Sequence, residues 1–428
     1  MKTLFFWLFP LVILTDCIGP LVQVGSLHAG HLKYGILLLA TVLTAPHWRL
    51  TLPVVAVLGF LVYVTGLAFL ASDWGNSLNG AMRLWLALSM YPVAVSVLRS
   101  WQDVTAFLRL LMVGAFVLVL TFGAAQVYPW GWEGYMRGSG FSYGGMGVYA
   151  TYAMVYLTLA AAVSLPLVRS KRRRLLALAV YGLAAMIVLV SFRRSAMAGL
   201  AVGGCALVVL GGVRLSMGRT LAGLGVLIPI AAACFFLFGE KVTQLYASRA
   251  VEGVHFEMAS RYGRVAETEK VWRDFTGGSP RHMLFGTEFS NATDIFEWKL
   301  NDRRIHVDYN VILDGAGAVG LGAFLLVYLL IALRFRASYR RLLRSRLATG
   351  LHALFWALLA ASLVFSASNQ LWVTVPYGLF FALLGALQRA AEVLPAKRAA
   401  AARAGVPLLR APLPLPPTTP ARSHARPA

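Results

Sequence analysis

Long hydrophobic runs separated by short polar segments make up most of this chain of 428 residues. A helix needs about 20 consecutive apolar residues to cross the hydrocarbon core of a bilayer. Runs of roughly this length occupy residues 3–25, 32–46, 50–71, 78–98, 104–127, 143–167, 174–191, 195–213, 219–239, 308–333, 350–370 and 374–392. The pattern predicts an all-α polytopic membrane protein with about 12 transmembrane helices.

The first run, MKTLFFWLFPLVILT, also fits the start of a secretion signal. No small-residue cleavage site follows it, and Asp16 and Pro20 lie inside the run. We therefore expect a retained first helix. The three cysteines all fall within predicted helices, so no disulfide framework is implied.

Composition supports the membrane class, because 59% of the residues are hydrophobic and only 13% are charged. The net charge of +22 resembles that of a nucleic-acid-binding protein, but the basic residues cluster in short loops. They lie at residues 169–174, at 334–346 and after Lys397. The positive-inside rule places these segments and both termini in the cytoplasm. We expect no nucleic-acid partner.

Four parts follow from this pattern. Residues 1–239 hold the first nine helices, 240–305 a large periplasmic loop domain, 306–392 the last three helices, and 393–428 a disordered cytoplasmic tail rich in Ala, Pro and Arg. The loop domain has ten basic and ten acidic residues, so it is formally neutral. In it, ASRYGRVAETEKVWRDF predicts a helix on the membrane surface and PRHMLFGTEFSN predicts a loop.

Several arginines lie on the predicted outer side, where the charge rule disfavours them. They are Arg193 and Arg194 in SFRRSAMAGL, Arg137 in YMRGSGFSYGG, and Arg83 about a turn into its helix. Arg83 could snorkel to lipid phosphates or pair with a carboxylate such as Asp73. The other arginines are candidates to hold a lipid diphosphate, because a guanidinium grips phosphate oxygens through two parallel hydrogen bonds.

The outer segment adds further candidates. Arg261 and Arg264 share a face of the predicted surface helix, although a solvated face of alternating charge explains them equally well. His306 and Asp308 lie where the chain returns to the bilayer. The histidine could cap the helix start or take a proton from a hydroxyl, and Asp308 could orient the imidazole or be the base.

A metal site is not expected, because no cluster of Cys and His residues and no DxD motif occurs. The usual sign of a metal-bound nucleotide-sugar donor is therefore missing. We expect no cofactor, and a donor whose phosphates are neutralised by arginine.

The order of these features resembles the O-antigen ligase and O-antigen polymerase superfamily of bacterial envelopes. His306 is followed at the family's spacing by Gly317 and Gly320, while Val307 stands where ligases usually have Asn, Ser or Gln. Arg194, Ser195 and Ala196 resemble the family's Ser-Arg-Ser/Gly-Ala turn, with Arg193 replacing the serine. RGSGFSY resembles an outer loop before the middle helices.

The resemblance implies a GT-C-like fold in the bacterial inner membrane and metal-independent glycosyl transfer on the periplasmic face. The donor would be an undecaprenyl-diphosphate-linked glycan and the acceptor a second glycan. Arg194 and Arg264 with His306 would be catalytic; Arg193, Arg261, Arg137, Asp308 and Asn310 would bind substrate. A chain-length regulator, export machinery and membrane lipids would be further partners.

Three functions remain open. DRRIHVDYN and Val307 resemble exopolysaccharide polymerases of the xanthan type, which favours polymerisation of lipid-linked repeat units. A ligase would instead transfer the glycan to lipid A core. A flippase for lipid-linked glycan would also need cations, but transporters place ionisable groups near the bilayer midplane.

Overall fold

The computed structural model describes residues 2–24, 27–28, 31–128, 141–168, 170–191, 193–211, 243, 264–286, 289, 305, 307–340, 342, 346–367 and 373–403. The α-helices in this part of the chain are α1 (Lys2–Ile18), α2 (Leu32–Thr44), α3 (Leu52–Leu70), α4 (Trp74–Leu88), α5 (Met90–Val97), α6 (Trp101–Val127), α7 (Ala150–Ser164), α8 (Lys171–Val190), α9 (Arg194–Gly211), α12 (Arg264–Gly277), α13 (Pro280–Phe285), α14 (Asp308–Tyr339), α15 (Arg346–Ser366) and α16 (Thr374–Arg403).

Short 3-10 turns adjoin several of these helices: η1 (Gly19–Leu21), η3 (Ala45–His47), η4 (Gly147–Tyr149) and η5 (Leu165–Leu167). The strands β1 (Gln23–Val24) and β2 (Leu27–His28) form a small antiparallel hairpin, in which Gln23 pairs with His28. The first predicted helix, 3–25, is therefore too long. It ends at Ile18, just before Gly19 and Pro20, and Pro20 cannot donate a backbone hydrogen bond to continue it.

Nine helices among the described residues are long and apolar enough to cross a membrane, and shorter apolar helices cover Phe5–Leu21 and Leu32–His47. Large apolar side chains are exposed along them, including Leu38, Leu39, Val42, Val62, Phe69, Leu329 and Leu333. Such a surface suits lipid and not water. The chain is an all-α polytopic membrane protein, as predicted. The predicted span 219–239 lies outside the described residues, and the count of twelve stays a prediction.

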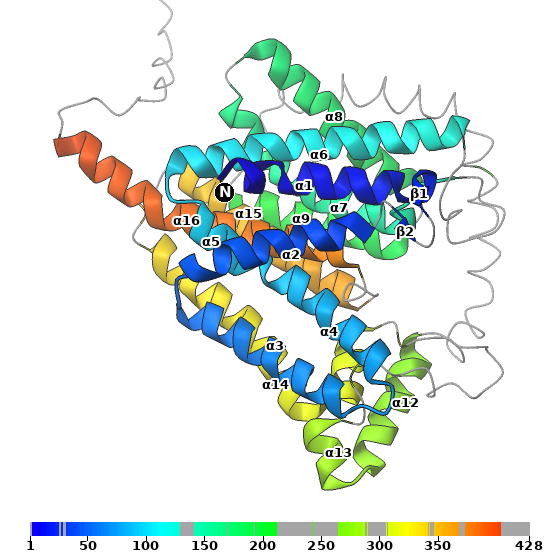
Figure 1. The fold of residues 1–428 in the computed structure, drawn as a ribbon. Coiled ribbons are helices and arrows are strands. Elements are labelled where there is room, and N and C mark those ends of the chain that lie inside the picture. Colours follow the sequence, from blue (N-terminus) through cyan, green and yellow to red (C-terminus); the bar gives the residue numbers. More distant parts are fainter. Residues whose placement is uncertain are drawn as a thin grey trace, which may run out of the picture.

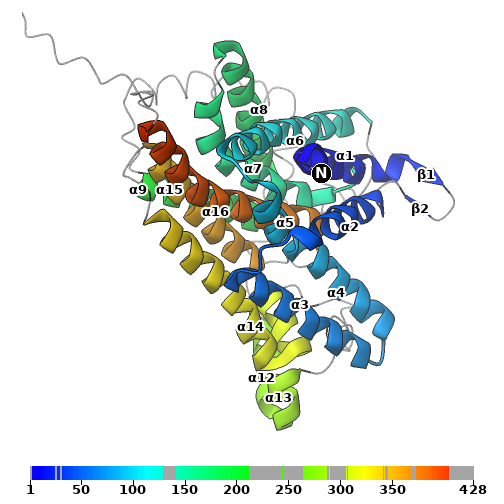
Figure 2. The ribbon, with the colours of Figure 1, turned by 60° about the vertical axis from the view of Figure 1, so that its left-hand side comes forward.

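The most buried span, α16, crosses the middle of the bundle (Figures 1 and 2). It packs on α5, α4 and α14, while α1 lies along α6, and α9 along α15. Its sequence YGLFFALLGAL is apolar on every side, which is typical of a helix without a solvent face. At Gly385 a side chain would lie 2.8 Å from the Tyr91 carbonyl oxygen, so this glycine permits close contact with α5.

The helix α16 also corrects the predicted disordered tail. It continues to Arg403 rather than ending near residue 392. Alanine, lysine and arginine dominate this last stretch, and all three favour helix. Residues 404–428 lie outside the described part of the chain.

The predicted run over 78–98 is one candidate span, Trp74–Val97, which is divided at Ser89 into the helices α4 and α5. It begins earlier, at Trp74, because the Asp73 carboxylate accepts a hydrogen bond from the Asn76 N–H and caps α4. The chain breaks at Ser89 and resumes as α5, which contains Pro92. Arg83 consequently lies deeper in its helix than a single turn.

The outer segment contains the predicted helix, here α12, but the loop predicted for PRHMLFGTEFSN is wrong in its first half. Residues 280–285 form the helix α13. The Ser279 hydroxyl accepts from the His282 N–H, and Pro280 occupies the first turn, where its missing N–H costs nothing.

The helix α14 is interrupted at Gly317, whose φ of 66° is left-handed. A side chain there would come within 2.3 Å of the Leu284 carbonyl oxygen, so the glycine lets α13 dock on α14. Gly286, with φ of 78°, makes the reciprocal close approach to Gly315. The break leaves the Ala316 carbonyl exposed to another donor, and the Tyr63 hydroxyl donates to it at 2.8 Å.

The ends of several described helices meet around two pockets. The end of α1, the start of α2, residues 145–149 and the start of α16 meet at one end. We call this the predicted outer end. Lys2, His47 and Arg99 meet at the opposite end, which the basic loops predict to be cytoplasmic.

Candidate functional site

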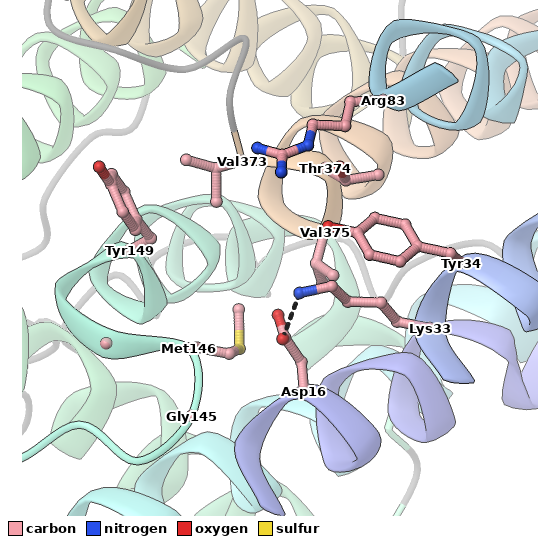
Figure 3. A pocket seen from close by; sticks show the side chains of 11 residues that line it. Asp16, Lys33, Tyr34, Arg83, Gly145, Met146, Tyr149, Val373, Thr374 and Val375 are labelled. Carbon is pink, nitrogen blue, oxygen red and sulfur yellow. Dashed lines mark hydrogen bonds and ion pairs between the residues drawn. The ribbon is translucent and has the colours of Figure 1, made fainter. Parts of the chain in front are cut away.

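A pocket of about 390 Å³ opens at the predicted outer end. Five separate segments build it, since its walls come from α1, α2, α4, the chain before α7 and the start of α16 (Figure 3). The lining residues are Asp16, Lys33, Tyr34, Arg83, Gly145, Met146, Gly147, Tyr149, Val373, Thr374 and Val375. This volume lies within the usual range for small-ligand sites.

An ion pair forms one wall. Lys33 Nζ donates to Asp16 Oδ1 at 2.5 Å, and both side chains are largely buried. The Lys33 ammonium also lies 5.1 Å from the centre of the Tyr34 ring. A buried charge is costly unless it is paired, so each of these two groups stabilises the other.

Arg83 enters the pocket from the opposite wall, and its guanidinium points toward Val373 and Thr374 (Figure 3). Its Nε donates to Asn79 Oδ1 at 3.3 Å. Within the described part of the chain Arg83 forms no ion pair, and Asp73 instead caps α4. Among the described residues, the Asp16 carboxylate of this pocket pairs with Lys33 and not with Arg83.

The chain before α7 reaches the pocket through a close glycine contact. The Gly145 N–H donates to the Cys17 carbonyl at 2.8 Å, and a side chain at Gly145 would lie 2.1 Å from the Asp16 carbonyl oxygen. Gly145 therefore brings this segment against the end of α1.

Arg193 contacts Tyr149, one of the residues that line the pocket. Its guanidinium carbon is 4.6 Å from the centre of the Tyr149 ring and 4.2 Å from that of Tyr152. Nη2 donates to the Tyr152 hydroxyl at 2.9 Å, whereas the buried Nη1 makes no hydrogen bond among the described residues. Two aromatic faces thus fix the arginine and leave one donor for another acceptor.

The same tyrosine connects Arg193 to the start of α9. Tyr152 Oη and Ser195 Oγ lie 2.9 Å apart, and the Tyr152 ring stacks on Phe365 with centroids 4.2 Å apart. Arg194, the first residue of α9, is exposed. Arg193 is therefore held in place, whereas its neighbour Arg194 is exposed.

The outer segment is fastened to α14 through a buried carboxylate. Glu267 Oε1 accepts from the Val307 N–H at 2.8 Å and from Asn310 Nδ2 at 3.4 Å. Asn310 also donates to Thr268 Oγ1 at 2.9 Å. Asp308, the first residue of α14, is fully buried. The amide of Asn310 therefore joins α12 to α14.

The remaining predicted site residues are placed only in part. His306, Arg261 and Arg137 lie outside the described residues. Arg264 is the first residue of α12. The structure thus brings Arg193 beside the pocket and puts Asp308 and Asn310 at the junction of α12 and α14.

Sequence reasoning missed Lys33, Asp16, Tyr149 and Glu267, and treated Arg83 mainly as a lipid-facing residue. A signal existed for the first pair, since Asp16 and Lys33 are opposite charges inside two successive apolar runs. Tyr149 carried no comparable signal, because aromatic residues occur in most of the predicted spans.

Metal ligands do not gather in the described ranges, where no group of three His, Cys, Asp or Glu side chains could hold an ion. The charged chemistry available there comes from arginine, lysine and carboxylate side chains.

No protein-family model and no curated protein sequence matches this chain. Its resemblance to the O-antigen ligase and polymerase superfamily therefore rests on the motifs alone.

Proposed function

We propose that this protein polymerises undecaprenyl-diphosphate-linked oligosaccharide repeat units into a surface or secreted polysaccharide. The reaction takes place on the periplasmic face of the bacterial inner membrane. The growing glycan is the donor and a hydroxyl of another lipid-linked unit is the acceptor. Both substrates keep their lipid tails in the bilayer, so a site at the membrane's outer edge holds them in a fixed orientation.

The observation that carries the proposal is the cationic pocket at the predicted outer end. Among the described residues Arg83 has no carboxylate partner, and Arg193 is held against Tyr149 with one donor that makes no hydrogen bond to them. The Arg193 guanidinium suits a departing diphosphate, because it stays charged and binds phosphate oxygens in pairs. Arg193 directly precedes α9 and so lies at the end of a span, which favours an enzyme over a flippase, whose charges would line a path across the membrane.

The reaction breaks the bond between the donor's anomeric carbon and the diphosphate oxygen, and the electron pair leaves with the diphosphate. The acceptor hydroxyl oxygen forms the new bond to that carbon. His306 accepts the hydroxyl proton, and Arg193, Arg194 and Arg264 stabilise the negative charge on the leaving group. Preorganised donors of this kind typically lower a barrier by about 3–4 kcal/mol each.

An assay of the purified full chain tests this function. Lipid-linked repeat units are incubated with the protein in detergent, where translocation has no meaning, and the lipid-bound products are separated by length. New glycosidic bonds that yield longer lipid-linked glycan are expected. Transfer only to added lipid A core would make the protein a ligase. The absence of any new bond with either acceptor would contradict glycosyl transfer altogether.

A further inference from the structure

The charges within the outer pocket specify more than a general affinity for anions. Among the described residues that line the pocket, three carry charge: Asp16, Lys33 and Arg83. The ammonium of Lys33 is taken by the Asp16 carboxylate at 2.5 Å. One positive charge, that of Arg83, is left for a ligand.

We infer that the pocket binds an acidic sugar of the repeat unit, with the Arg83 guanidinium gripping its carboxylate. This inference rests on the proposed function and names the substrate class of its site. A carboxylate brings one negative charge and two coplanar oxygens, which match one guanidinium fork. A diphosphate brings at least two charges, so part of its charge would lie uncompensated beside the Asp16 carboxylate.

The other walls suit a sugar ring. Tyr34 and Tyr149 line the pocket with rings that offer apolar faces to the C–H groups of a pyranose. Thr374 adds a hydroxyl beside the end of Arg83 (Figure 3). Few polar groups placed among apolar and aromatic walls are typical of sites that orient a small polar ligand.

The neighbouring Arg193 gives the diphosphate a separate place. Its guanidinium contacts the Tyr149 ring, and Tyr149 lines the pocket. A sugar in the pocket and a diphosphate at Arg193 would thus both lie close to Tyr149. Lipid-linked glycan has this arrangement of sugar beside diphosphate.

The test is ligand-observed saturation-transfer NMR on the purified full chain in detergent. Methyl β-glucuronoside is the acidic probe, methyl β-glucoside is its neutral match, and inorganic pyrophosphate is the competitor. The glucuronoside should bind and the glucoside should not. Arg83→Gln should weaken glucuronoside binding by about tenfold or more, since a hydrogen-bonded charge pair is lost. Arg49→Gln, at an exposed arginine of the opposite end, should leave binding unchanged.

Three results would overturn the inference: equal binding of the neutral glucoside, full binding by Arg83→Gln, or displacement of the glucuronoside by pyrophosphate in an Arg83-dependent manner. Arg83→Lys keeps the positive charge but cannot form the two parallel hydrogen bonds of a guanidinium, so this variant should bind the glucuronoside weakly. It serves as the second variant if Arg83→Gln does not fold. Full binding of the glucuronoside by Arg83→Lys would then contradict recognition through paired hydrogen bonds.

The polymerisation assay separates this inference from the proposed function. Repeat units whose carboxylates have been reduced to alcohols should react at least about tenfold more slowly than native acidic units. Equal rates would overturn the acidic-sugar inference and leave polymerisation intact. Failure to react with either substrate would remove the proposed function, while the NMR result would still decide what the pocket binds.

Discussion

Glu267 and Val307 join the outer segment to the membrane helices, because the carboxylate oxygen Oε1 accepts the Val307 backbone N–H at 2.8 Å. The carboxylate is almost fully buried on α12, and Val307 directly follows His306 in the chain. Because Glu267 accepts this hydrogen bond from the backbone, the bond restricts the position of the chain at Val307 independently of the neighbouring side chains. Any role of His306 in proton transfer therefore depends on Glu267.

We predict that Glu267→Ala will lower glycan polymerisation at least about tenfold and reduce stability by roughly 1–3 kcal/mol, since the Val307 N–H loses a charged acceptor. Glu267→Gln keeps a side-chain oxygen for the same N–H and should retain most activity. Product length and thermal unfolding in detergent measure the two effects. Equal activity of the alanine and glutamine variants would show that this bond does not position the site.

The hydroxyl of Tyr152 offers a second test, directed at Arg193. Tyr152→Phe keeps the ring on which the guanidinium lies, at 4.2 Å, but removes the oxygen that accepts from Nη2. We predict a loss of about three- to tenfold in turnover, because Arg193 Nη2 loses its acceptor. The matched control is Tyr328→Phe, which removes another buried tyrosine hydroxyl, 2.9 Å from that of Tyr377. If both variants lost activity equally, the effect would reflect packing and not Arg193.

Sequence patterns predicted the helical spans well, because each span must satisfy its own backbone hydrogen bonds and hide them in an apolar surface. The breaks inside them were harder to predict. Gly317 was singled out only by its spacing from His306, whereas its left-handed backbone depends on where α13 docks. The α13 helix itself was missed, although Ser279 followed by Pro280 is a recognisable helix start.

The candidate site was predictable only in part, for a related reason. Arg193 was found because a cation at the outer side violates the charge rule. The charges of Lys33 and Asp16 cancel. The positive-inside rule counts excess positive charge, so it singles out neither residue. The pocket joins segments from residue 16 to residue 375, and no local pattern in the sequence indicates which distant loops meet.

Two glycines of α14 provide a test of the docking of α13. Gly317→Ala should destabilise the protein by about 1–3 kcal/mol, because its φ is 66° and the new Cβ would lie 2.3 Å from the Leu284 carbonyl oxygen. Gly322→Ala meets no atom within 4 Å and should be neutral or slightly stabilising. Thermal unfolding of the two variants in detergent gives the comparison. A Gly317→Ala protein as stable as Gly322→Ala would contradict the close contact with α13.

The ion pair of the pocket is open to a double-mutant cycle. Asp16→Asn and Lys33→Gln each leave a largely buried partner charged and alone, and each should destabilise the protein by about 3–5 kcal/mol. The double variant should lose less than the sum of the two single changes, with a coupling of about 1–3 kcal/mol. Additive losses in chemical or thermal unfolding would mean that the two groups do not stabilise one another.

The rate of glycosidic bond formation by purified Arg193→Gln protein, compared with Arg49→Gln, is the most direct test of a reaction centre at the predicted outer end. Both substitutions remove one arginine, but only Arg193 lies beside the pocket, stacked on Tyr149. We predict a loss of about 100-fold for Arg193→Gln, as for removal of one preorganised donor, and an unchanged rate for Arg49→Gln. Wild-type rates in a stably folded Arg193→Gln protein would contradict a role for this end of the bundle in catalysis.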